Sequence, residues 1–218
     1  MATELTSPSR TMPTREAGAP SRTAALAEVA DAATALISSR QNASPKRLIG
    51  PGPDAEQVHR MLSAAAAAPD HGRLSPWRFV HISASKRHRL GDAFASALVE
   101  RDPSATPAQI TAAYEKAHRA PFLMLAVVRL ATDRDCAIPD EERLVSLGCA
   151  IQNILLTAKA LGFGSGLTSG RGIESAPLRE LFGLSAAERA ICFVNVGTVS
   201  SQQPPRMRPT PGQLLSSL

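Results

Sequence analysis

The spacing of hydrophobic residues predicts helices in the first half of the chain. In residues 22–40, apolar side chains recur every three or four positions, which is the period of an amphipathic helix. The segment 55–68 has the same period and follows Asp54, a residue type that commonly caps helix N-termini. The segment between these two helices is rich in proline and glycine, so we expect a loop there.

Two further helices are expected downstream. One should cover about residues 86–100, with Ser85 as its cap. The other should run from Pro107 to about His118, because proline is favoured in the first turn of a helix.

Other segments have the patterns of strands. Residues 77–83 alternate and are rich in β-branched and aromatic side chains. Residues 121–130 and 190–199 are almost continuously apolar, which is typical of strands buried on both faces. A shorter strand is expected within FGSGLTSG, residues 163–170.

A long, strongly apolar helix is predicted over residues 140–162. Its apolar side chains cover well over half of the helix surface, so we expect burial in the core or in a subunit interface. Ser175 then precedes a short helix. No regular βαβ repeat is present, and the expected class is α+β, with a sheet flanked by helices.

The chain ends differ from the rest. Residues 1–21 are rich in Ser, Thr, Pro and Ala without a hydrophobic period, so we expect a disordered tail. Residues 22–218 form the predicted folded domain, which ends in a proline-rich arm from about residue 200.

Charge and composition reduce the number of function classes that the chain could belong to. The 218 residues have a net charge of +5. Basic residues are interspersed with acidic ones and form no run of five or six, which does not favour a nucleic-acid interface. Cys136, Cys149 and Cys192 are widely spaced, and the histidines have no metal-ligand spacing, so neither disulfides nor a metal site is expected. No apolar run approaches the ~20 residues of a membrane span, and no signal peptide is evident. These features indicate a soluble cytoplasmic protein.

The glycines between residues 162 and 172 suggest a ligand loop. They complete no GxGxxG, and they follow a helix and a strand, whereas a Rossmann motif needs strand, glycine turn and helix. The backbone amides and the hydroxyls of Thr168 and Ser169 could face a planar polar ligand. A turn without a ligand explains these residues equally well.

Two other polar clusters have more than one interpretation. Arg40, Gln41 and Asn42 could bind phosphate and ring oxygens, although a solvated helix end explains them as well. Asp70 and His71 could form a catalytic dyad, but adjacent loop residues rarely point toward each other. Alternatively, Asp70 is a cap and His71 is partly exposed.

Four segments in order resemble the nitroreductase family of FMN-dependent oxidoreductases, in particular its small NAD(P)H nitroreductases of the YdjA type. They are LISSRQNASPKRL for the Arg-Arg-Ser loop, AAPDHGRLSPWRFV for the Ala-Pro to Pro-Trp-x-Phe segment, GCAIQNILLTAKALGFGSGLTSG for the interface helix and glycine loop, and VNVGTV for the last core strand. The resemblance covers about residues 30–212. It implies a nitroreductase-like fold with a central mixed sheet, and a homodimer that holds FMN in two interface clefts.

The resemblance also implies site residues. The implied FMN contacts are Arg40, Gln41, Asn42, Ala67, Pro69, His71, Leu167, Thr168, Ser169, Gly170 and Arg208. Of these, Pro69 and His71 would approach the flavin from the partner subunit. A possible NAD(P) segment comprises Thr157, Ala158, Lys159, Ala160, Leu161 and Gly162, and Arg73 would lie on the substrate side.

The chain departs from the family pattern at three places. Arg73 and Ser75 stand where the family frequently has Asn and Gln before Pro-Trp, which places a cation near the substrate side. Gln41 and Asn42 replace an arginine and a serine, which removes one positive charge from the phosphate site. Ala67 replaces an arginine of the YdjA-type proteins, so only its backbone could contact flavin.

The resemblance implies an FMN-dependent reaction in two halves. NAD(P)H would reduce the flavin and leave, and a nitroaromatic, quinone or similar acceptor would then take the electrons. The flavin performs the chemistry, so no catalytic nucleophile is expected. The alternatives are another flavin enzyme on the same fold and a non-catalytic FMN-binding protein.

Overall fold

The computed structural model describes residues 22–132, 137–201, 204 and 206–218. The predicted tail at 1–21 and Cys136 therefore lie outside the described residues. The chain divides into two units, Met1–Ala35 and Leu36–Leu218. Helix α1 (Arg22–Ser39) confirms the first predicted helix, and none of its side chains is buried.

The second unit is built on a five-stranded sheet. Its strands are β1 (Leu48–Ile49), β2 (Trp77–His81), β3 (Phe122–Arg129), β4 (Gly164–Thr168) and β5 (Glu188–Val199). The order is β1-β5-β3-β2, and β4 also pairs with β5. Every strand pair among the described residues is antiparallel, and the parallel component is an isolated bridge between Asn42 and Ser165.

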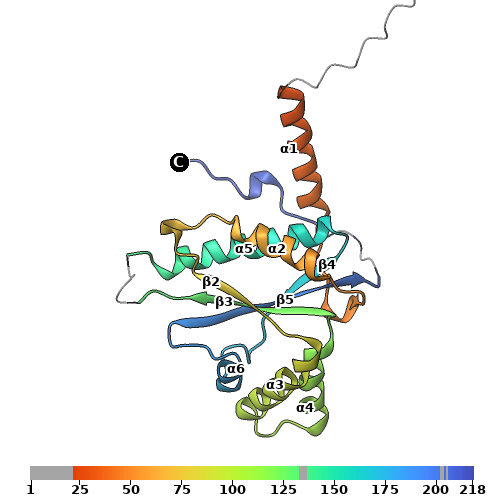
Figure 1. Ribbon diagram of the computed structural model, residues 1–218, viewed down its shortest axis with the longest axis vertical. Coiled ribbons are helices and arrows are strands. Elements are labelled where there is room, and N and C mark those ends of the chain that lie inside the picture. The colour runs from red at the N-terminus through yellow and green to blue at the C-terminus, as the bar shows by residue number, and fades with distance from the viewer. Residues whose placement is uncertain (1–21, 133–136, 202–203, 205) are drawn as a thin grey trace, which may run out of the picture. The chain divides into compact units, whose positions relative to one another are not determined.

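Helices cover both faces of this sheet (Figure 1). Helices α2 (Ala55–Ala66) and α5 (Asp140–Ala160) lie on one face, and α3 (Arg87–Arg101), α4 (Pro107–Tyr114) and α6 (Ala176–Leu181) lie on the other. The expected α+β architecture, with a helix-flanked sheet, is confirmed.

The position of β3 between two helical layers explains why its sequence is continuously apolar. Met124 and Ala126 belong to the core formed with α2 and α5, whereas Leu123 and Leu125 belong to the core formed with α3 and α6. Successive side chains of a strand point to opposite faces, so a strand between two helical layers needs apolar residues at every position. The prediction of a strand buried on both faces is confirmed.

Two local predictions need correction. The segment expected to be a loop before α2 contains β1, whose two residues pair with the end of β5 and are too few to form a hydrophobic pattern. Ser85 is not the cap of α3: it lies inside a 3-10 turn, Ala84–Lys86, and its hydroxyl contacts that of Ser83 at 3.1 Å.

The predicted cap of α2 is confirmed. The Asp54 carboxylate accepts from the Gln57 amide at 2.8 Å, and the Gln57 side-chain oxygen accepts from the Asp54 amide at 2.9 Å. This capping box satisfies two backbone donors that the first helical turn leaves free. It thereby fixes where the helix that leads to Pro69 begins.

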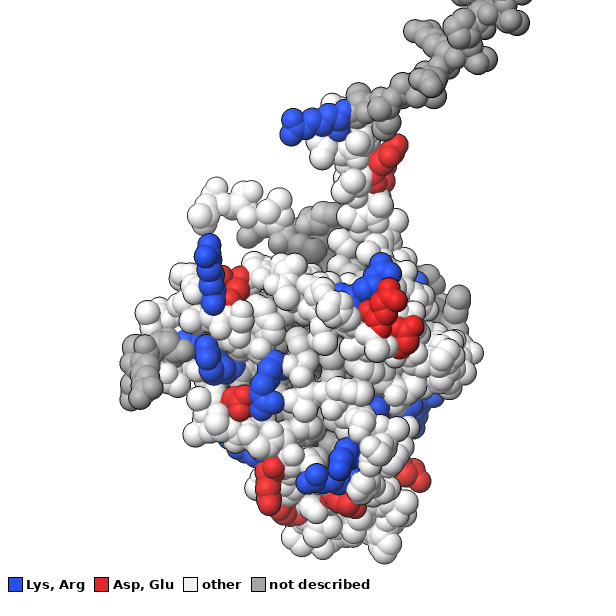
Figure 2. All heavy atoms as spheres, viewed as in Figure 1, with Lys and Arg blue, Asp and Glu red and all other residues white. Residues whose placement is uncertain are grey.

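On the face shown in Figure 2, basic and acidic side chains of the second unit are interspersed and form no continuous stripe of one sign. No helix in the described parts of the chain has both the length and the apolar composition needed to cross a bilayer.

Candidate functional site

The loop that follows β4 lines a cavity of about 420 Å³. The cavity lies among α3, α4, this loop and β5. Thr168, Ser169 and Gly170 form part of its wall, and Phe94 and Phe193 contribute apolar surface. Three of the four predicted glycine-loop residues thus face a ligand-sized space. The fourth, Leu167, does not line it and is 41% exposed.

Asn195 on β5 holds this loop. Its buried side-chain amide donates to the Gly166 carbonyl at 3.2 Å and to the Thr168 hydroxyl at 3.0 Å. Asn195 also lines the cavity. Asn195 was not among the residues predicted from the sequence. An amide inside the apolar strand sequence VNVGTV was nevertheless a detectable signal, since buried polar residues need partners.

Four basic side chains line the same cavity: Arg101, Lys116, Arg119 and Arg171. None of them forms a hydrogen bond or ion pair with another described residue, and none of the described lining residues is acidic. Unpaired cations beside an apolar wall create a positive potential that favours an anionic ligand. These four residues were not predicted from the sequence, because they are isolated basic residues on separate segments.

Arg40 and Arg208 lie together, although 168 positions separate them. The Arg208 guanidinium donates to the carbonyl oxygens of Arg40 at 2.8 Å and Ser38 at 3.0 Å. The Arg40 guanidinium is half-buried and has no partner among the described residues. The Arg208 guanidinium is therefore held at the backbone of the segment that carries Arg40.

The Arg40 loop continues alongside β4. The Ala43 amide donates to the Ser165 carbonyl at 2.9 Å, and exposed Asn42 forms the parallel bridge to Ser165. The approach is close, because a Cβ added to Gly166 would lie 2.2 Å from the Ala43 carbonyl oxygen. This contact joins the predicted phosphate loop, which includes exposed Gln41, to the strand that leads into the glycine loop.

The loop at residues 69–75 has a different environment. The Asp70 carboxylate accepts from the Ser75 amide at 2.6 Å, and His71 Nδ1 lies 2.6 Å from Glu142 Oε2. The two side chains therefore have separate partners and form no dyad. None of the site residues predicted in this region lines the cavity, and all of them are exposed: Ala67, Pro69, His71 and Arg73.

The family comparison supports the overall assignment. The sequence profile of the nitroreductase family matches residues 50–198, which is most of the chain. The chain belongs to the nitroreductase family. It is an enzyme of the oxidoreductase class, as the sequence predicted.

Similar proteins agree with this assignment. The nitroreductase-family chain is 35% identical to a Haemophilus influenzae protein named "Putative NAD(P)H nitroreductase", over 77% of this chain and 88% of the relative. It is 34% identical to the Escherichia coli K12 protein named "Putative NAD(P)H nitroreductase YdjA", over 75% of this chain and 86% of the relative. A crystal structure of a nitroreductase-like family protein from Bacillus cereus has the same fold, with a TM-score of 0.74 and 17% sequence identity. The match covers 85% of this chain and 95% of the Bacillus cereus chain.

In this nitroreductase, the segment predicted to contact NAD(P) forms the end of α5. The Thr157 hydroxyl donates to the Asn153 carbonyl at 2.8 Å, and Ala158 is fully buried. Gly162 has a φ of +87° and ends the helix, and the Phe163 amide donates to the Ala158 carbonyl. Lys159 and Ala160 are exposed and accessible. A role in binding NAD(P) remains a prediction.

The residues present fit FMN. The half-buried Arg40 guanidinium has no described partner, and the Arg208 guanidinium contacts the Arg40 backbone, so both cations are available for a phosphate. The cavity by the glycine loop combines apolar surface, backbone amides and unpaired cations, which suits a flat ring that gains negative charge on reduction.

No group of three or more His, Cys, Asp or Glu side chains with metal-binding geometry occurs among the described residues. Burial raises the pKa of the Cys192 thiol to about 11, so the reactive thiolate is disfavoured at neutral pH.

Proposed function

We propose that the chain is an FMN-dependent oxidoreductase that passes electrons from NAD(P)H to a nitroaromatic, quinone or similar acceptor, in two half-reactions. The observation that carries the proposal is the cavity beside the glycine loop, which is lined by four unpaired basic side chains and no described acid. A flavin that cycles between neutral and anionic forms needs such an environment.

Each part of the site has a role in this proposal. Arg40 and Arg208 neutralise the FMN phosphate, and the backbone of Leu167–Gly170 lies along the ring. Lys116 and Arg119 stabilise negative charge on the ring from inside the cavity. When bound, FMN supplies the acceptance and release of hydride, and the protein binds, orients and tunes it.

The reductant is proposed from the relatives. Both curated relatives carry names that specify NAD(P)H. Residues 157–162 are the proposed contact for that dinucleotide.

The second half of each site is proposed to come from a second copy of the chain. Ala67, Pro69, His71 and Arg73 are exposed and do not line the cavity of their own chain. A homodimer would bring them to the flavin of the partner and would leave Arg73 facing the acceptor. A cytoplasmic location remains a prediction.

Spectroscopy of the purified protein tests this function. The protein as isolated, or after addition of FMN, should be yellow and should bleach on anaerobic addition of NADH or NADPH. A binder that does not bleach would be an FMN carrier, and slow reoxidation by quinones and nitroaromatics would favour another flavin reaction. A protein that takes up no FMN would overturn the proposal.

The phosphate assignment has its own test. Arg40→Ala should weaken FMN binding at least about tenfold, because a charge-assisted hydrogen bond is worth about 1.5–3 kcal/mol. Arg22→Ala is the matched control, since Arg22 lies on the exposed helix α1. The dissociation constants follow from fluorescence titration, and equal losses in the two variants would contradict the assignment.

A further inference from the structure

A hydrogen bond between two side chains joins the loop at residues 69–75 to the first turn of α5. His71 Nδ1 and Glu142 Oε2 lie 2.6 Å apart. Both side chains are open to solvent, with exposed fractions of 65% for His71 and 48% for Glu142. The neighbouring Glu141 is also exposed, but it has no hydrogen bond or ion pair with a described residue. The contact is therefore specific to one of two adjacent acids.

This contact determines which nitrogen of His71 is available. A carboxylate only accepts hydrogen bonds, so Nδ1 must be the donor. In the neutral ring, the proton then resides on Nδ1, and Nε2 has a free lone pair. In the charged ring, Nε2 becomes a second donor. In either state Nε2 is the nitrogen that a ligand can reach.

The backbone of this loop is held in an unusual conformation. Gly72, Arg73 and Ser75 have φ values of +71°, +55° and +41°. The hydrogen bond from the Ser75 amide to Asp70 closes the turn at 2.6 Å. Gly72 adopts this region without cost, but in Arg73 and Ser75 it costs free energy and persists only where the surroundings enforce it. The loop thus presents His71 from a defined backbone, and Glu142 then orients the ring.

We propose that Glu142 is a positioning residue, which fixes the His71 ring so that Nε2 faces an oxygen atom of the acceptor. This inference rests on the proposed function, in which His71 reaches the flavin cleft of the partner subunit. It names a class of substrate, namely acceptors whose reduced oxygen takes up a proton, such as quinones.

The proposed proton transfer balances. Reduction of a quinone to a hydroquinone consumes two electrons and two protons. A hydride from the reduced flavin of the proposed function brings both electrons and one proton. The His71 imidazolium supplies the other proton from Nε2 to a quinone oxygen, as a new O–H bond forms and the N–H bond breaks. Solvent then protonates the ring again.

Imidazole nitrogen NMR tests the positioning without any turnover. In ¹⁵N-histidine-labelled wild-type protein, the neutral His71 ring should be mainly the Nδ1–H tautomer, and His71→Ala identifies its signals. Glu142→Gln should move the ring toward the Nε2–H tautomer, which predominates in water. Glu141→Gln is the matched control and should leave the tautomer unchanged. An unchanged tautomer in Glu142→Gln would overturn the inference.

Kinetics of the FMN-loaded enzyme with a quinone provide the second measurement. His71→Ala should lower kcat about 100-fold, within the usual range for a proton donor, and should change KM little. Glu142→Gln should lower kcat about tenfold, as the loss of an orienting partner does elsewhere. In the double variant, the loss should equal that of His71→Ala alone, because both act through one ring.

Multiplicative losses in the double variant would contradict the inference, as would a loss in Glu141→Gln equal to that in Glu142→Gln. Failure of the proposed function has a different result: the wild-type protein would bind no FMN, while the tautomer of His71 could still be measured.

Discussion

At the scale of single residues, similar glycines in one loop have different roles. A Cβ at Gly166 would lie 2.2 Å from the Ala43 carbonyl oxygen, whereas a Cβ at Gly170 would meet nothing within 4 Å. Gly166 is therefore required for the contact between β4 and the Arg40 loop. Gly170 is instead free to face a ligand from the cavity wall. The sequence pattern FGSGLTSG could not distinguish these two roles.

Gly166→Ala should destabilise the fold by about 2 kcal/mol, because the added methyl group collides with backbone that cannot move without cost. Gly170→Ala is the matched control and should change stability by no more than about 0.5 kcal/mol. Urea denaturation of the FMN-free protein measures both. Equal stabilities for the two variants would show that the Arg40 loop is not held against β4.

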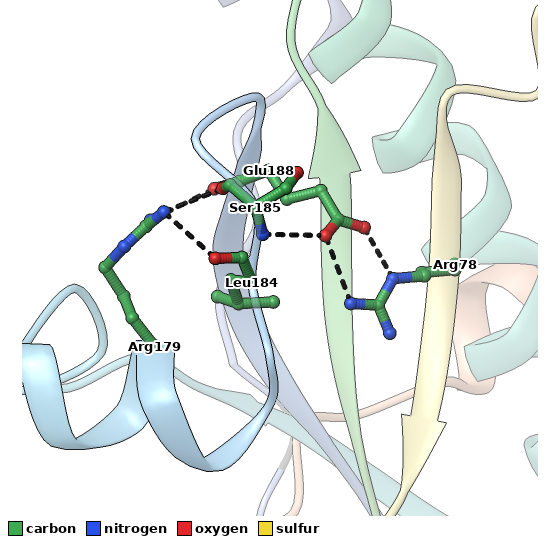
Figure 3. Close-up of polar contacts among 5 residues, drawn as sticks. All are labelled: Arg78, Arg179, Leu184, Ser185 and Glu188. Carbon is green, nitrogen blue, oxygen red and sulfur yellow. Dashed lines mark hydrogen bonds and ion pairs between the residues drawn. The ribbon is translucent and has the colours of Figure 1, made fainter.

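At the scale of elements, an ion pair connects strands that are not neighbours. Arg78 on β2 donates to Glu188 on β5 at 2.6 and 3.3 Å, across the intervening strand β3 (Figure 3). Arg179 on α6 donates to the carbonyl oxygens of Glu188 and Ser185, so the same corner also secures the turn before β5. The hydrogen bond from Arg78 is the main cause that lowers the pKa of Glu188 below its ordinary value of 4.5.

This lowered pKa predicts a pH-dependent stability. The folded state holds the Glu188 proton less tightly than the unfolded state, so the ionised pair stabilises the fold above pH 4.5. That contribution is lost as the pH falls through the lowered pKa. Glu188→Gln should therefore cost about 1 kcal/mol at pH 7, and the difference from wild type should shrink in acid.

Urea denaturation at a series of pH values checks this prediction. The matched control is Glu180→Gln, because Glu180 is exposed on α6 and has no described partner. A Glu188→Gln deficit that stays constant down to pH 2 would contradict the assignment of the stability to the ion pair.

At the scale of the whole molecule, we expect a partner chain on the α2–α5 layer. Val145 on α5 is 68% exposed and Leu62 on α2 is 38% exposed, although α5 is otherwise rich in buried residues. Exposed apolar side chains that gather into a patch commonly mark an interface. The partner-side residues of the proposed site are also exposed, so a second copy of the chain is the expected occupant.

Light scattering should give a mass twice the 23.0 kDa of one chain. Val145→Lys should shift the protein to the monomer and lower FMN retention, since burial of an unpaired charge at an interface is unfavourable. Val99→Lys is the matched control, because Val99 is 41% exposed on α3, across the sheet from α5. A monomeric wild-type protein would contradict the shared site.

Much of the fold follows from local patterns in the sequence. The continuous apolar run of β3 and the hydrophobic period of α5 each predicted the correct element, because burial acts on every side chain of an element. Ser85 was assigned wrongly because its residue type favours caps, but the chain forms a 3-10 turn first. β1 was missed because its pairing with β5 is a long-range contact.

By itself, the sequence determined the α+β class, the positions of the long elements and, through four matching segments, the family. Only the tertiary structure brought Arg101, Lys116 and Arg119 to one cavity with Asn195, and His71 to Glu142. The physical reason is that hydrophobic periodicity is local, whereas the field in a cavity depends on which distant segments pack together. No spacing along the chain encodes that proximity.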